Sequence, residues 1–391
     1  MASIGRPTLS PAGFLARCGG ASSSSQVTAS LMAAMLFEPE FGPGPARRRS
    51  RRRVAASKRA SRAKLAAIAL PSFILAIYAA NALWPAPDPA GVPRVLAHRG
   101  LFQHTRPKTA DNNETCSARR MEPPSHPYLE NTIASIRASF DAGAAATEVD
   151  VHPIQDGEFA VFHDDELDCR TDGKGSIRQH SLAYLKSLDA GYGYTADRGR
   201  SFPFRGKGVG MINSLNEVLQ AFPDRTIVID VKSKEASDAQ RLLDYLTAAN
   251  HATDGSLWIW AEGDARDRLK ELAPEAHVIS TGRAKACVAA YLATGWTGHV
   301  PQACRGATIF VPIDLRRAYW GWPKAFLDRM DRAGTEVVLT GPLGERDLGI
   351  SRIEDLDAVP AGFSGVVMTD RIELIGPEIR RRWPDRRFAK L

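Results

Sequence analysis

Short apolar segments alternate with helical patterns between residues 94 and 385, and this alternation constrains the fold more than any other feature of the sequence. Helical spacing of apolar residues is found, for example, over 238–248 and 324–333. Eight strands that alternate with helices are typical of a (β/α)8 TIM barrel. We therefore predict an α/β protein whose main domain, 94–385, is such a barrel. The expected strands are 95–97, 147–151, 227–231, 257–260, 277–279, 308–312, 336–339 and 365–368.

One expected strand carries two acidic residues. Glu148 and Asp150 stand two apart in the run ATEVDVH, and residues at this spacing project from the same face of a strand. Two neighbouring anions repel, and a divalent cation removes that repulsion. Hard carboxylate oxygens suit Mg²⁺ or Ca²⁺. A pair of solvent-facing carboxylates on an edge strand is the alternative interpretation.

The dipeptide Asp156-Gly157 follows this strand and is a strong signal for a two-residue hairpin turn. A loop of that length would place His163 directly opposite Asp150. Opposed residues have Cβ atoms about 5 Å apart. The sequence therefore predicts an imidazole beside the acidic pair.

Two other strand ends carry polar groups. His98-Arg99-Gly100 follows the first strand, and a histidine at such a strand end would lie at the mouth of a barrel. Asp230 and Lys232 share one face at the end of the strand 227–231. A surface His-Arg pair and an exposed ion pair are the alternatives.

A helical pattern, ENTIASIRASFDAG, precedes the acidic strand. Glu130 opens this pattern, and Gly143 is suited to end it as a C-cap. The Glu130 carboxylate could serve the site, or it could simply face the positive end of the helix dipole.

The N-terminal segment carries most of the positive charge. Residues 1–64 contain twelve Lys/Arg and two Asp/Glu, although the whole chain has a net charge of only +7, so the main domain is mildly acidic. Residues 1–46 are rich in Ala, Ser, Gly and Pro, a composition typical of disorder. Residues 47–64 hold ten basic residues and no acidic one. Alone, such a run could bind nucleic acid.

The next segment disfavours nucleic acid as a partner and indicates a membrane. Residues 65–84 contain no charge over 20 positions, which is the length of one transmembrane helix. Basic residues before it place the N-terminus in the cytoplasm and the barrel on the periplasmic or extracellular side. Residues 85–93 form a Pro-rich linker. The alternative is a signal peptide cleaved after Ala82.

The main domain contains four cysteines, which permit three pairings. An exported domain would keep disulfides. We expect Cys287–Cys304, which encloses a Gly-rich run, and Cys116–Cys169, which joins the loop before Glu130 to the loop after His163. Four reduced thiols are the alternative.

Taken in order, the motifs HRG, ENT, E-x-D-V, DG…VFHD, LDCRTDGKG, D-V-K and GVVMTD resemble the glycerophosphodiester phosphodiesterase family over roughly residues 94–385. The resemblance implies a (β/α)8 barrel with a small insertion after the second strand, here about 152–210. It also implies metal-dependent hydrolysis of glycerophosphodiesters to glycerol 3-phosphate and an alcohol.

The family's site residues carry over to matching positions of this sequence. The resemblance implies His98 and His163 as the catalytic acid and base, and Arg99 and Lys232 as phosphate-binding cations. It implies one divalent cation, Mg²⁺ or Ca²⁺, with these ligands: Glu130, Glu148, Asp150 and Asp230.

The sequence departs from the family at four points, the first of which is the long loop 101–128 before the ENT motif. The family usually has Glu where Asp230 stands, so this ligand would reach less far. Cys169 interrupts the usual L-x-R-T-x-G motif, and Leu339-Thr340 replaces a common Trp-Thr pair. These departures bear on the range of substrates more than on the reaction.

Two alternative functions remain within a membrane-tethered protein. The first is a related lipid phosphodiesterase, of the lysophospholipase D or phosphoinositide-cleaving type, because tethering brings lysophospholipid-like substrates within reach. The second is a binding domain that has lost catalysis. The sequence carries no signal for an oligomeric state.

Overall fold

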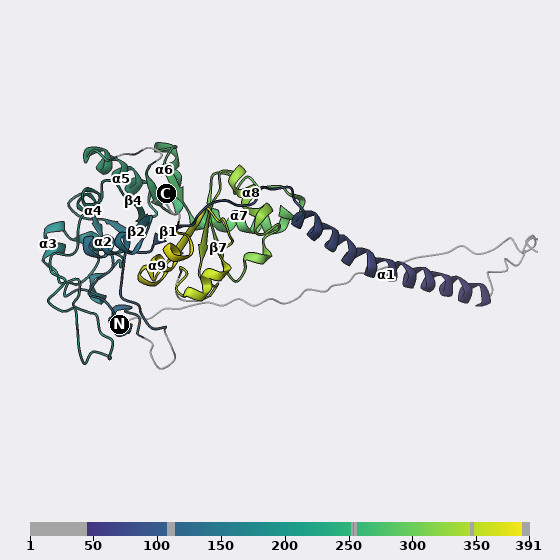
Figure 1. Cartoon of the computed structure of the whole chain (residues 1–391), viewed down its shortest axis with the longest axis horizontal. Helices are drawn as coiled ribbons and strands as arrows, with labels where there is room; N and C mark the ends of the chain where they lie inside the picture. The colour runs from purple at the N-terminus through teal and green to yellow at the C-terminus, as the bar shows by residue number, and fades with distance from the viewer. Residues whose placement is uncertain (1–44, 108–113, 252, 254–255, 345–347, 385–391) are drawn as a thin grey trace, which may run out of the picture. The chain divides into compact units, whose positions relative to one another are not determined.

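The structure, a computed structural model, describes residues 45–107, 114–251, 253, 256–344 and 348–384 of the 391-residue chain (Figure 1). The chain divides into two units, Met1–Ala67 and Ile68–Leu391. Residues 1–44 of the segment expected to be disordered lie outside the described residues, whereas Pro45 and Ala46 already belong to a helix.

Eight parallel strands form a nearly closed barrel, as predicted. Their order is β6-β5-β4-β2-β1-β9-β8-β7, and no pairing between β6 and β7 is found in the described part of the chain. Every expected strand is present, so the TIM-barrel prediction is confirmed. The strands are β1 Arg94–Ala97, β2 Ala146–Pro153, β4 Thr226–Val231, β5 Trp258–Trp260, β6 His277–Ile279, β7 Thr308–Pro312, β8 Glu336–Thr340 and β9 Val366–Thr369.

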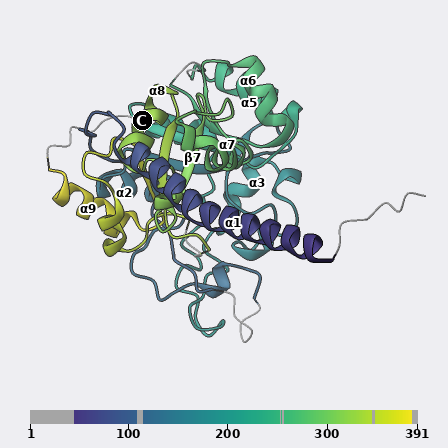
Figure 2. The same cartoon turned by 90° about the vertical axis from the view of Figure 1, so that its right-hand side faces the viewer.

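Helices cover the outside of the barrel. The helices α5 and α6 lie side by side in both views (Figures 1 and 2). The covering helices are α2 Ile133–Ala142, α4 Leu215–Ala221, α5 Ala236–Ala248, α6 Gly263–Leu272, α7 Thr281–Thr294, α8 Lys324–Arg332 and α9 Ile372–Arg382.

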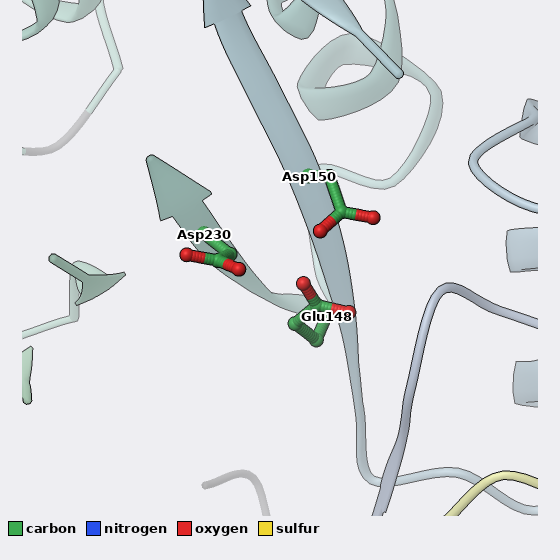
Figure 3. A group of neighbouring side chains, drawn as sticks. All are labelled: Glu148, Asp150 and Asp230. Carbon is green, nitrogen blue, oxygen red and sulfur yellow. The ribbon is translucent and has the colours of Figure 1, made fainter. Parts of the chain in front are cut away.

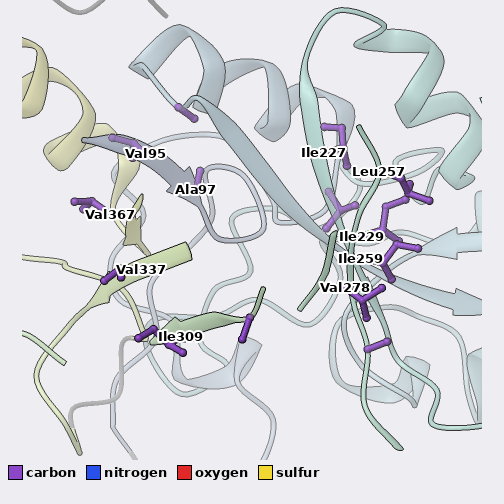
Figure 4. Packing of buried hydrophobic residues seen from close by; sticks show 14 of the residues in the cluster. Val95, Ala97, Ile227, Ile229, Leu257, Ile259, Val278, Ile309, Val337 and Val367 are labelled. Carbon is purple, nitrogen blue, oxygen red and sulfur yellow. The ribbon is translucent and has the colours of Figure 1, made fainter. Parts of the chain in front are cut away.

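The two faces of each strand have separate roles. Val95 and Ala97 point toward the helices, in the core cluster drawn in Figure 4. Leu96, between them, belongs to a second cluster with residues such as Ala146 and Val228, which fills the barrel interior. Side chains alternate between the two faces of a strand. Polar residues that stand two or four positions after these interior residues on the same strand therefore also point into the barrel, near its mouth.

An insertion follows β2, as the resemblance implied, and occupies the chain between Pro153 and Ser214. It contains β3 Phe159–Val161, α3 Leu182–Ser187 and short 3-10 helices, among them η2 Leu167–Cys169. Its apolar residues form a small core of their own, which includes Ile154, Leu167 and Leu185.

The hairpin register differs by one residue from the prediction. Val151 faces Val161, and the Asp150 carbonyl accepts a hydrogen bond from the Phe162 N–H, so His163 is not opposite Asp150. The loop has three residues rather than two, because Ile154 and Glu158 close it. Its last residue, Gly157, has φ 87°, a conformation that glycine adopts without strain.

The helix α2 begins later than the sequence pattern indicates. Thr132 is its N-cap and exchanges hydrogen bonds with Ser135 in a capping box, and Gly143 ends it with φ 109°, as predicted. Glu130 therefore lies in the turn before the helix rather than in its first turn. The next residue, Asn131, has φ 59°.

Two disulfides join Cys116 to Cys169 and Cys287 to Cys304, which confirms the predicted pairing. The bridges span 53 and 17 residues. In the loop-entropy description, closing loops of these lengths stabilises the fold by roughly 3–4 kcal/mol each. The fifth cysteine, Cys18, lies outside the described residues.

The long helix α1, Pro45–Ala82, contains both the polybasic and the apolar segments. Its segment Lys64–Asn81 is long and apolar enough to cross a membrane. The linker that follows packs against the barrel: the Gly91 N–H donates to the Gly362 carbonyl at 2.8 Å. A Cβ on Gly362 would lie 1.6 Å from the carbonyl oxygen of Pro89, so only glycine fits there.

Candidate active site

Three carboxylates meet at the ends of β2 and β4, on the interior face of the barrel (Figure 3). Asp150 and Asp230 are directly paired neighbours on the parallel strands β2 and β4. Glu148 lies two residues before Asp150 on β2, on the same face. Each offers one oxygen, and these oxygens lie within 4.8 Å of one another. The strand register thus brings together residues that are about eighty positions apart in the chain.

Two cations neutralise part of this negative charge. The Lys232 Nζ lies 2.6 Å from Asp150 Oδ1 and 2.5 Å from Asp230 Oδ2. The Arg99 Nε lies 3.3 Å from Asp150 Oδ2. The Arg99 N–H also donates to Glu148 Oε2 at 3.0 Å.

The HRG turn after β1 is built to hold these contacts. Arg99 has φ 55°, a strained conformation for a residue with a side chain. Its N–H bonds to Glu148, and its carbonyl accepts from the Asn131 N–H at 3.1 Å. A Cβ on Gly100 would lie 2.7 Å from the Ser135 hydroxyl. The motif therefore needs glycine for the close approach of α2.

The His98 ring has a defined orientation. Its Nδ1 lies 2.5 Å from Asp370 Oδ1 at the end of β9, and Asp370 also accepts from the Gly349 N–H. The Arg99 Nε–H donates to His98 Nε2 at 3.2 Å. This arrangement assigns the proton to Nδ1 and makes Nε2 the acceptor from Arg99, with Glu148 Oε2 3.9 Å away.

His163 has a carboxylate partner of its own. Its Nδ1 lies 2.6 Å from Oδ1 of the adjacent Asp164. The other oxygen of Asp164 accepts from the Arg170 Nε–H at 2.9 Å. His163 is partly exposed and close enough to Asp150 for its charge to lower the pKa of that carboxyl.

Glu130 stands apart from the group of three carboxylates. Its Oε2 accepts from Arg170 at 2.9 Å, and its Oε1 lies 3.4 Å from Arg99 Nη1. Arg170 is buried and also donates to the Tyr194 hydroxyl and to the Ser117 hydroxyl. Arg170 therefore forms hydrogen bonds with both the candidate metal ligand Glu130 and Asp164, the partner of His163.

Burial shapes the protonation of the cluster. It is the main cause that raises the pKa of Glu148 to about 8, and the neighbouring Asp150 adds to it. Burial also raises the pKa of Asp230. Burial opposes ionisation of Asp150 as well, but Arg99, with His163 and Lys232, holds its pKa well below the usual value. At Glu148 and Asp230 burial therefore outweighs the nearby positive charges, which include Arg99 and Lys232.

This donor set fits a hard divalent cation. Carboxylate oxygens in a compact group are the ligands that Mg²⁺ and Ca²⁺ prefer, and a bound cation would stabilise the ionised forms of Glu148 and Asp230. Asp230 belongs to the group despite its shorter side chain. The part of the chain that the structure describes thus supplies a possible metal site of three carboxylates, with Glu130 beside it.

A cavity of about 690 Å³ opens over the cluster. His98, Arg99, Glu148, Asp230 and Lys232 contribute to its wall, and Trp260 adds an aromatic face. Five of the eight predicted site residues therefore share one cavity. Asp150 lies beneath it, in contact with Lys232.

Three supporting residues were not predicted as site residues. Asn131 holds Asp150 from both sides, since its Nδ2 donates to Oδ2 at 2.7 Å and its Oδ1 accepts from the Asp150 N–H at 3.0 Å. Asp370 orients His98, and Arg170 links Glu130 to Asp164. Each belongs to a motif noted in the sequence, ENT, GVVMTD or LDCRTDGKG, but the motif alone assigns no role to it.

Known proteins resemble the chain in sequence. The profile of the glycerophosphoryl diester phosphodiesterase family matches residues 98–291. The glycerophosphodiester phosphodiesterase of Caldanaerobacter subterraneus subsp. tengcongensis is 31% identical over 105 residues, which are 27% of this chain and 40% of the relative. The enzyme of that name from Bacillus subtilis is 35% identical over 96 residues, 24% of this chain and 31% of the relative. The chain thus matches less than half the length of these relatives.

Among solved structures, the glycerophosphodiester phosphodiesterase of Agrobacterium tumefaciens aligns with 73% of this chain and 100% of its own, at 20% identity and a TM-score of 0.47. The family match is independent of this alignment. It runs from His98 through the insertion to α7 and so includes Glu130, the carboxylate cluster and His163. The segment 98–291, which holds these site residues, belongs to the glycerophosphoryl diester phosphodiesterase family.

Proposed function

We propose that this protein hydrolyses glycerophosphodiesters to glycerol 3-phosphate and an alcohol, with one divalent cation, Mg²⁺ or Ca²⁺. The observation that carries the proposal is the pairing of each histidine with its own carboxylate beside the acidic cluster. Asp370 orients His98, and Asp164 orients His163.

The charges of the site suit a phosphodiester anion. Four acidic side chains, Glu130, Glu148, Asp150 and Asp230, face two cations, Arg99 and Lys232. A divalent cation would bring this centre to neutrality and would supply Lewis-acid stabilisation to the non-bridging phosphate oxygens. Arg99 and Lys232 would donate hydrogen bonds to the same oxygens as their charge grows.

The histidines would carry out the proton transfers. His98 Nε2, which accepts from Arg99 while Nδ1 faces Asp370, is suited to take a proton, and the partly exposed His163 ring faces Asp164 in the same way. One histidine would remove a proton from the nucleophile, and the other would protonate the leaving alkoxide. The nucleophile is either water or the glycerol hydroxyl next to the phosphate, through a cyclic intermediate.

A lipid phosphodiesterase is the second candidate function, and the apolar part of α1 favours it. A catalytic domain tethered at a membrane meets lysophospholipids or phosphoinositides at high local concentration. We further propose this layout: a cytoplasmic basic segment over 47–64, a membrane span over 65–84, a linker over 85–93 and the phosphodiesterase domain over 94–385.

A comparison of three substrates tests the reaction. Glycerophosphocholine, glycerophosphoinositol and lysophosphatidylcholine should be offered to the purified full-length protein with Mg²⁺ or Ca²⁺. We expect release of glycerol 3-phosphate from the first two at higher kcat/KM than any cleavage of the third. Faster cleavage of lysophosphatidylcholine would support the lipid phosphodiesterase, and no hydrolysis of any of them would support a binding domain.

The disulfides test the proposed location of the barrel outside the cytoplasm. In protein isolated from its native compartment, non-reducing peptide mapping should find Cys116 joined to Cys169 and Cys287 joined to Cys304, because disulfides persist in oxidising compartments. Four alkylatable thiols at these positions would contradict both the pairing and the export of the domain.

A further inference from the structure

The last turns of α1 are fixed to the outer side of the barrel. The buried Asn81 side chain donates from Nδ2 to the Trp296 carbonyl at 3.1 Å. Its Oδ1 accepts from Arg329 Nη1 at 2.8 Å. A polar residue at the end of an apolar helix is thus satisfied by the barrel itself. The C-terminal turns of the candidate membrane span therefore contact the barrel.

Aromatic side chains surround this junction. Phe73 of α1 packs edge-on against Trp296, with ring centroids 6.4 Å apart, and Tyr78 packs in the same way against Trp320 at 6.2 Å. Tyr78 is 57% exposed and Trp296 is 40% exposed. Tryptophan and tyrosine with one apolar and one polar end are enriched at the boundary between lipid and water.

A cavity of about 590 Å³ lies at the same place. Its wall includes Tyr78 and Trp320, together with Arg316 and Arg317 from the one-turn helix η5, Arg316–Ala318. None of its lining residues lines the cavity over the carboxylate cluster. It is therefore a separate cavity from the candidate active site.

The charge of this second cavity is positive. Arg316 donates to the Ile313 carbonyl, and Arg317 is exposed, with no hydrogen bond or ion pair found for it among the described residues. The one acidic residue in the wall, Asp357, is paired with Arg382. Two guanidinium groups beside an aromatic wall suit a phosphate group attached to an apolar chain.

We infer that this second cavity binds the headgroup of an anionic phospholipid, with the phosphate at Arg316 and Arg317 and the acyl chains along the exposed apolar face of α1. The inference rests on the proposed membrane anchoring. The apolar side chains of α1 that would meet the acyl chains are exposed in the structure, among them Leu70, Ile74 and Leu75. Lipid is the occupant because Tyr78 of α1 forms part of the cavity wall, so the cationic cavity adjoins the helix that carries this exposed apolar surface.

Quenching of tryptophan fluorescence tests the inference on the full-length protein in detergent micelles. Brominated phosphatidylglycerol and brominated phosphatidylcholine should be titrated separately, since bromine quenches only tryptophans in contact with the lipid. We expect tighter binding of phosphatidylglycerol, and loss of most of its specific quenching in Trp320→Phe. Arg317→Ala should weaken phosphatidylglycerol binding about fivefold, the effect of one basic residue beside an anionic lipid surface.

The matched control is Arg200→Ala, which removes an exposed arginine from the insertion and should leave phosphatidylglycerol binding unchanged. Hydrolysis of glycerophosphocholine by Arg317→Ala should equal that of the wild type, which shows that the variant is folded. Equal binding of the two lipids, or unchanged binding in Arg317→Ala, would overturn the inference and leave the proposed hydrolysis intact.

Two further outcomes separate the inference from the proposals on which it depends. Selective lipid binding in a protein that hydrolyses nothing would support the inference and defeat the proposed reaction. Release of the full-length protein from membranes by an alkaline wash would defeat the anchor and the inference together.

Discussion

Replacement of His98 by alanine should lower kcat by about 10²–10⁴-fold, the range for loss of a general acid or base. The same loss is expected for His163→Ala. KM should change little, because the proposed phosphate-binding cations, Arg99 and Lys232, remain in place. Steady-state kinetics with glycerophosphocholine at saturating metal would measure both constants.

The control for these two variants is His299→Ala, which removes an exposed histidine outside the site and should keep wild-type activity. Thermal denaturation of all three variants would separate a loss of chemistry from a loss of folding. Turnover near the wild-type value in either His98→Ala or His163→Ala would remove that histidine from the mechanism.

Removal of the divalent cation should abolish hydrolysis, and added Mg²⁺ or Ca²⁺ should restore it. The physical reason lies in the three packed carboxylates, whose charge would repel a phosphodiester in the absence of a cation. Exhaustive chelation followed by elemental analysis and an activity assay would measure the effect. A fully active protein with no bound metal would falsify the proposed cofactor.

Glu148→Gln should weaken metal binding by at least 10–100-fold, the range for loss of a residue that merely supports a ligand. The fold should tolerate the change, because burial already raises the pKa of Glu148 to about 8, so a neutral side chain of the same shape fits the site. Isothermal titration with the metal would give the affinity, and thermal denaturation the stability.

The matched control is Glu271→Gln, in which an exposed glutamate of α6 loses its charge. Its metal affinity should equal that of the wild type. A Glu148→Gln protein that binds the metal with wild-type affinity would exclude this residue as a ligand.

The barrel could be predicted from the sequence because its signal is local and repeated. Each buried strand is a short apolar run, such as β4, which ends at Asp230 and Val231 before Lys232, and each run needs only its own residues to be recognised. The disulfide pairing was also predicted, since Cys116 and Cys169 lie in loops that flank the same site residues in the chain.

The predicted hairpin register was wrong because the same dipeptide occurs in hairpin loops of two different lengths. Asp156-Gly157 can close a two-residue loop or end a three-residue loop whose glycine has positive φ, and the structure has the second. A shift of one residue turns every side chain of a strand to the other face. Motif spacing, rather than the hairpin argument, is therefore the better predictor for His163.

The supporting residues of the site depend on contacts that no local pattern encodes. His98 and Asp370 lie 272 residues apart, and β1 and β9 bring them together because the barrel closes between the first and last strands. Arg170 reaches Glu130 from the insertion, 40 residues along the chain. Such pairings follow from the topology, so they become predictable only once the strand order is known.

The packed linker between α1 and β1 has a consequence for how the protein would meet its substrates. Close contacts at Gly91 and Gly362 pack this linker against the barrel, so it is not a free, extended chain. With the proposed anchor in a bilayer, this short packed linker would keep the barrel close to the membrane surface. Soluble diesters would then have to diffuse to the enzyme, whereas lipids would pass beneath it by lateral diffusion, and the rate of encounter with each would depend on the crowding of the membrane surface.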